Sequence, residues 1–203
     1  MIIESIGVIL IFGCAAFCGI ILATFACAKF EGFADGPQSR PIHPALLIGG
    51  AMVLGLVLAL KGTPTIQLGL TALLCVPLAA IWFSDAAKGV VPDWFTLGPL
   101  AIVALYVITH HAWWVALSAI VPFVPFALAE SVSKGRGMGW GDAKFVALGG
   151  AIIGMQSSLL VFALACFVAT VASVIRDRGK TPVAFAPYLV ASVAVAIALQ
   201  VHL

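Results

Sequence analysis

The chain has 203 residues, of which 63% are hydrophobic and 9% charged, and its formal net charge is +2. A soluble globular domain carries about 25% charged residues, so this composition excludes one and indicates a polytopic membrane protein that contacts membrane lipid. The net charge is too small for a basic nucleic-acid surface, and no phosphate-binding or base-stacking motif is present, so we expect no nucleic-acid partner.

Charged residues, prolines and glycines divide the chain into eight apolar segments. In chain order these cover residues 5–28, 44–60, 66–84, 97–109, 112–129, 143–155, 157–175 and 183–201. We predict an all-α fold with about eight transmembrane helices in a single membrane domain, residues 1–203. The sixth segment would be only ~20 Å long as a helix, so seven spans are the alternative if residues 143–175 form one helix.

Basic residues are divided unequally between the two sets of loops. With eight spans, nine of the ten Lys and Arg residues fall on one side, and Lys61 stands alone on the other. Cytoplasmic loops are enriched in Lys and Arg, so the first side is predicted to face the cytoplasm. A continuous helix over 143–175 would weaken this bias, which favours a break near Gly154–Ser158.

Two aspartates lie at the ends of different spans on the predicted cytoplasmic side. Asp85 ends the third span, and Asp142 follows a run rich in glycine directly before the sixth. Acids in membrane segments are costly and usually serve a function. The structural alternative is that Asp142 caps a helix and that Asp85 pairs with Lys88.

Alternate glycines at 135, 137, 139 and 141 favour a functional role, because they remove side chains that would obstruct an extended peptide. Gly139, Gly141 and Lys144 are the residues we expect to contact a substrate. If Asp85 and Asp142 come within a few Å, repulsion makes them share a proton, as in an aspartic protease dyad. One would then activate water while the other protonates the leaving group.

Two further acids are given structural interpretations. Asp93 competes with Asp85 for the first catalytic position, but we favour Asp85 and interpret residues 92–96 as a loop that caps the fourth span. Glu130 is interpreted as a solvated loop charge, with attraction of a basic substrate segment as the alternative.

Three segments together resemble one family. Lys134–Gly149 closely resembles the Gly-x-Gly-Asp segment of type IV prepilin peptidases, Asp85–Leu97 is similar to their first aspartate segment, and Pro182–Leu189 to the segment that opens their last span. The resemblance implies a prepilin-peptidase-like core over residues 66–203, with Asp85 and Asp142 as the catalytic residues.

The resemblance also implies a substrate and a location. The enzyme would be an intramembrane aspartyl endopeptidase of the prokaryotic cytoplasmic (inner) membrane, with its active site facing the cytoplasm. Its partners would be pilin-like precursors, whose short basic leader is removed for type IV pilus, secretion or conjugation assembly.

One departure from the family concerns cysteines. Many members carry two Cys-x-x-Cys pairs in the first cytoplasmic loop, whereas residues 29–44 contain no cysteine, so we expect no metal and no cofactor. Longer members also methylate the new N-terminus, and for this chain we predict a peptidase alone. The alternative functions are a proton-coupled transporter that uses Asp85 and Asp142 as a relay, and a structural membrane subunit.

Overall fold

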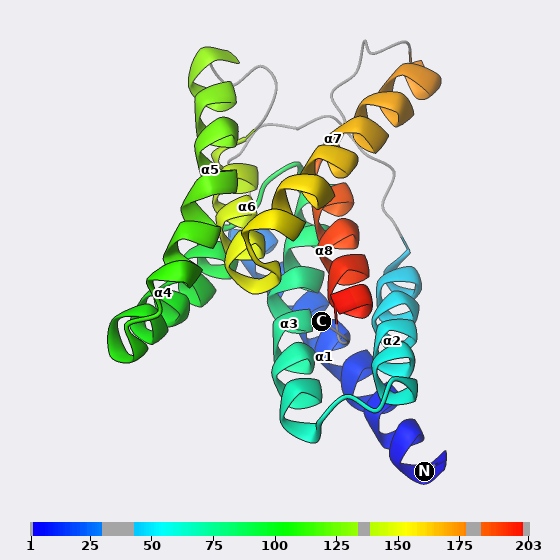
Figure 1. Cartoon of the computed structure of the whole chain (residues 1–203). Helices are drawn as coiled ribbons and strands as arrows, with labels where there is room; N and C mark the ends of the chain where they lie inside the picture. The colour runs from blue at the N-terminus through cyan, green and yellow to red at the C-terminus, as the bar shows by residue number, and fades with distance from the viewer. Residues whose placement is uncertain (1, 30–42, 134–138, 178–183, 201–203) are drawn as a thin grey trace.

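The computed structural model describes residues 2–29, 43–133, 139–177 and 184–200. Within these ranges the chain forms eight α-helices and no β-strand (Figure 1). In chain order they are α1 (Ile2–Lys29), α2 (Pro44–Leu60), α3 (Thr65–Lys88), α4 (Asp93–His110), α5 (Trp113–Ser133), α6 (Trp140–Ile153), α7 (Met155–Asp177) and α8 (Ala186–Gln200). The predicted all-α fold is confirmed.

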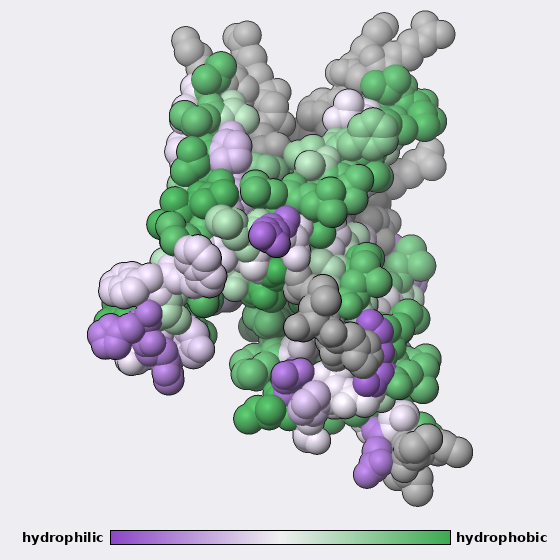
Figure 2. All heavy atoms as spheres, viewed as in Figure 1, coloured by the Kyte–Doolittle hydropathy of each residue, from purple (hydrophilic) through white to green (hydrophobic). Residues whose placement is uncertain are grey.

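Among the described residues, five helices are long and apolar enough to cross a membrane: α1, α3, α4, α5 and α7. The helices α2 and α8 are also apolar but shorter, at 17 and 15 residues. Figure 2 shows hydrophobic residues over much of the visible surface of α5 and α7, and hydrophilic ones where α4 joins α5. This distribution confirms a polytopic membrane protein, since lipid-facing helix surfaces are apolar and their ends polar.

Small residues bring the helices close together. A Cβ atom at Gly19 of α1 would lie 2.3 Å from the carbonyl oxygen of Val76 in α3. A Cβ atom at Gly150 of α6 would lie 2.2 Å from the carbonyl oxygen of Ser118 in α5. Helices in lipid associate by such close packing, because there is little hydrophobic driving force between them.

The break expected near Gly154 is present. Gly154 separates α6 from α7 with φ +83° and ψ 161°, a backbone conformation that is essentially restricted to glycine. The resulting α6 has 14 residues and is about 21 Å long, too short to span the hydrocarbon core alone. Most of its residues are buried, and it packs against α4, α5, α7 and α8, so protein surrounds it in place of lipid.

The end of α3 and the start of α4 differ from the boundaries expected from the sequence. The helix α3 continues past Asp85 to Lys88 and is ended by Gly89, which has φ +67°. The helix α4 begins at Asp93 with Pro92 at its N-cap, so the loop expected over 92–96 is wrong beyond Pro92. An acid in the first turn favours a helix start, and this signal outweighs the low hydrophobicity of the turn.

Candidate active site

Asp85 lies in the last turn of α3 and points to the beginning of α8. Its side chain is only 6% exposed, and its Oδ2 accepts a hydrogen bond of 3.0 Å from the backbone N–H of Ala186. The backbone N–H of Phe185 is near enough to act on this carboxylate as well. The first N–H groups of a helix have no partner within the helix and carry a partial positive charge, so the start of α8 is a suitable binding site for an anion.

Asp142 lies in the first turn of α6 and is 7% exposed. Its Oδ2 accepts a hydrogen bond of 3.2 Å from the backbone N–H of Gly139, the N-cap residue. Its Oδ1 is buried without a hydrogen-bond partner among the described residues. Asp142 therefore does help to cap α6, but capping uses only one of its two oxygens, and a buried polar atom left over needs another explanation.

The two aspartates interact with each other across the helix ends. The charge of Asp85 acts on the carboxylate of Asp142, and so does that of Glu130 in the last turns of α5. Glu130 is 6% exposed and helical, so its interpretation as a solvated loop charge is wrong. No sequence signal indicates its burial, because the apolar part of α5 ends in a polar stretch that is typical of an exposed helix end.

The space beside Gly141, the glycine before Asp142, is occupied by the side chain of Val91 from the segment that follows Asp85. A Cβ atom at Gly141 would lie 2.7 Å from the Cβ atom of Val91, which follows Asp85 in the link between α3 and α4. At Gly139, by contrast, an added Cβ would meet only ordinary contacts, the nearest being Asp142 Oδ2 at 3.8 Å. Packing against Val91 therefore requires glycine at position 141 and not at 139.

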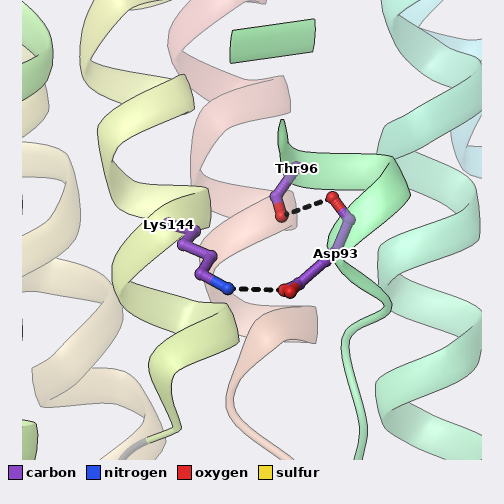
Figure 3. A network of polar contacts seen from close by, with 3 residues as sticks. All are labelled: Asp93, Thr96 and Lys144. Atoms are coloured by element: carbon purple, nitrogen blue, oxygen red, sulfur yellow. Dashed lines mark hydrogen bonds and ion pairs between the residues drawn. The ribbon is translucent and has the colours of Figure 1, made fainter. Parts of the chain in front are cut away.

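Lys144 is turned toward α4. Its Nζ forms an ion pair of 2.6 Å with Oδ1 of Asp93, the first residue of α4 (Figure 3). The hydroxyl of Thr96 donates to the backbone carbonyl of Asp93 at 3.2 Å and closes the first turn of α4. Asp93 thus connects α4 to α6. From the sequence alone, it is interpreted only as part of a loop that caps the fourth span.

The structure brings Asp85 and Asp142 into one buried site, and it puts Gly139, Gly141 and Lys144 around the second of them. The assignment of these three residues to substrate binding stays a prediction. Sequence reasoning missed the backbone of Phe185–Ala186 as a partner of Asp85. The segment that carries it, Pro182–Leu189, lies in the described part only from residue 184.

Metal ligands do not gather at this site. Among the described residues, no group of three or more His, Cys, Asp or Glu side chains is arranged to hold a metal ion. Three acids do interact here, but one oxygen of Asp85 and one of Asp142 already accept hydrogen bonds from backbone N–H groups. The chemistry that the described residues themselves offer is proton transfer by carboxyl groups.

A polytopic helical membrane protein with two buried, interacting aspartates at helix ends is the class that the fold and this site define. The model of the Type IV leader peptidase family matches residues 72–174, about half of the chain, and this range includes both aspartates. The chain therefore belongs to the type IV leader peptidase family, whose members are membrane-embedded peptidases. Searches of curated proteins and of solved structures found no match.

Proposed function

We propose that this family member is an intramembrane aspartyl endopeptidase, with Asp85 and Asp142 as its catalytic pair. Its substrates would be type IV prepilin-like precursors with a short basic leader. The observation that carries the proposal is that two carboxylates from different helices are buried together and interact electrostatically. A capping or packing role would need neither the second acid nor the buried oxygen of Asp142 that has no partner among the described residues.

Asp85 is proposed as the general base. Burial disfavours the charge of Asp85, but the backbone N–H of Ala186 at the start of α8 donates to its carboxylate, and this hydrogen bond favours the ionised form and offsets part of that effect. Its remaining lone pairs can accept a proton from a water molecule that attacks the scissile carbonyl. The helix dipole of α8 supports the same assignment, because its positive end faces the carboxylate.

Asp142 is proposed as the proton donor. Burial first, and then the charges of Asp85 and Glu130, disfavour ionisation of Asp142, so we propose that it holds the shared proton. Its Oδ1 can then donate to the carbonyl oxygen of the substrate and afterwards protonate the leaving amine. The proton taken up by Asp85 resets the pair for the next cycle.

An apolar cavity whose wall reaches Trp82 of α3 supports the proposal that the substrate carries an apolar segment. The cavity has a volume of about 250 Å³ and lies between α1, α2, α3 and α8. Its wall includes Leu47, Leu54, Leu78 and Trp82, and Trp82 precedes Asp85 by one helical turn. We propose that large apolar side chains next to the scissile bond bind here, while the basic leader stays at the aspartate end.

The active site is proposed to face the cytoplasm in the cytoplasmic membrane of a prokaryote. In the topology expected from the sequence, nine of the ten Lys and Arg residues fall on the side of the aspartates. The exception, Lys61, lies at the opposite end of α2, where its Nζ donates to the backbone carbonyl of Ala198 near the end of α8. Basic residues are retained on the cytoplasmic side during insertion, which supports this orientation.

The test is coexpression with candidate pilin-like precursors, read as a mobility shift equal to the loss of the leader. Asp85→Asn and Asp142→Asn should each reduce processing by about 10²-fold or more, because each removes one partner in acid–base catalysis. Both variants should still insert, and Lys88→Gln, which changes an exposed residue of the same helix end, should process normally. Undiminished processing by either Asn variant would refute the aspartyl mechanism.

A further inference from the structure

The segments that carry the two aspartates are joined by two contacts which lie away from the carboxyl groups themselves. The first is the packing of Val91 against Gly141, and the second is the ion pair of Asp93 with Lys144 (Figure 3). Val91 and Asp93 both follow Asp85 in the chain within eight residues, and Gly141 and Lys144 flank Asp142. Each contact therefore connects a neighbour of one aspartate to a neighbour of the other.

The ion pair is poorly suited to a role in stability. The side chain of Asp93 is 58% exposed and that of Lys144 26%, and ion pairs at such exposure contribute little to the free energy of folding. Its geometry is nevertheless well defined, because the Thr96 hydroxyl bonds the backbone of Asp93 and fixes the first turn of α4. Lys144 extends from α6 two residues after Asp142, so the pair joins that helix to the first residue of α4.

We propose that Asp93 and Lys144 form a positioning clamp for the catalytic pair. The clamp holds the first turn of α6 against the beginning of α4. It thereby keeps the carboxyl group of Asp142 close to that of Asp85 and to the same substrate atoms. Neither residue touches the reacting atoms. This inference rests on the proposed proteolytic function and adds two positioning residues to it.

Local charges agree with this role. Lys144 lies in the second turn of α6 and Asp93 at the first position of α4, where an acid is favoured by the helix dipole. The ion pair directs the ammonium group of Lys144, two residues along α6 from Asp142, to Asp93 on α4. A cation held between the aspartates would instead stabilise both as carboxylates and remove the proton that the mechanism needs.

The experiment is a double-mutant cycle on the full chain in detergent micelles, with Asp93→Asn, Lys144→Gln and the double variant. The probe is a synthetic precursor with a short Lys-containing leader ending in Gly, followed by an apolar helix of about 20 residues. Each single variant should lower kcat by about ten- to a hundredfold, as expected for a small misplacement of a catalytic group. The KM should change by less than about twofold, because the substrate contacts are kept.

The double variant should be no slower than the slower single variant, since both residues act as one unit. Lys144→Arg, which keeps the charge and the reach, should retain most of the activity, and Lys88→Gln should behave as the wild-type chain does. Single variants at wild-type kcat, or losses that multiply in the double variant, would overturn the clamp. A raised KM in Lys144→Gln alone would also overturn it, because that result assigns Lys144 to the substrate.

Hydrogen exchange of the same variants without substrate separates this proposal from the proposed function. Loss of the clamp should speed exchange of the backbone amides over residues 91–96 and 140–146, while the remaining helices stay protected. Unchanged exchange in both segments would count against the clamp. If the wild-type chain leaves the probe uncut but exchange increases as expected, the clamp stands and the proteolytic function fails.

Discussion

The contact between Val91 and Gly141 leads to a prediction about the glycine that precedes Asp142. Gly141→Ala would put two Cβ atoms 2.7 Å apart, whereas ordinary contacts lie at 3.4–4 Å. The two aspartate segments must therefore separate by about 1 Å, since neither Cβ atom can rotate away from the other. Overpacking of this kind costs about 1–3 kcal/mol in stability. A displacement of about 1 Å at a catalytic group reduces the rate by about 10²-fold.

The assay compares cleavage of the synthetic precursor by four variants in the same detergent. Gly139→Ala is the matched control, because its Cβ would meet only ordinary contacts, and it should stay within about threefold of the wild-type rate. Gly141→Ala should be about 10²-fold slower. Combining Gly141→Ala with Val91→Gly removes one Cβ and should restore most of the rate, whereas Val91→Ala keeps that Cβ and should not.

This reasoning is refuted if Gly139→Ala and Gly141→Ala are equally slow. That pattern would mean that a substrate peptide lies against both glycines, as the alternation of glycines by itself suggested. It is refuted as well if Val91→Gly fails to rescue Gly141→Ala while the double variant melts at the wild-type temperature.

Two further predictions concern stability and are measured as melting temperatures in detergent. Gly154→Ala should cost about 1–3 kcal/mol, because its φ of +83° is strained for alanine although space is free, while Gly69→Ala in the exposed part of α3 should be neutral or stabilising. Equal melting of these two alanine variants would contradict the strain argument. Asp85→Ala should cost about 1–3 kcal/mol more than Asp85→Asn, because only Asn keeps an acceptor for the buried N–H of Ala186. Identical melting of both would mean that the bond to α8 is not maintained.

Much of the fold could be predicted from the sequence, because the signals for membrane helices and their ends lie in short stretches of neighbouring residues. The apolar segments, the helix break at Gly154 and the two acids are read directly from residue order. The starts and ends of helices were less accurate: α3 extends to Lys88 and α4 begins at Asp93, since first and last turns at a membrane edge are polar and resemble loops.

Only part of the candidate site could be predicted from the sequence. Asp85 and Asp142 were expected to meet on chemical grounds, but the surroundings of each depend on partners that are distant in the chain. The bond to Ala186 spans 101 residues and involves a backbone N–H, for which a side-chain pattern carries no information. The burial of Glu130 and the turn of Lys144 toward Asp93 likewise depend on how α4, α5 and α6 pack, which the order of residues alone did not determine.

The hydrogen bond from the N–H of Ala186 in α8 to Asp85 has a practical consequence for shortened versions of the chain. The range that matches the family ends at residue 174, before α8 begins, yet one of the proposed catalytic acids is anchored on that helix. A chain cut after the matched range would keep both aspartates and lose what holds the first in place. Any minimal enzyme designed from this protein must therefore retain its final helix, joined or supplied as a separate peptide.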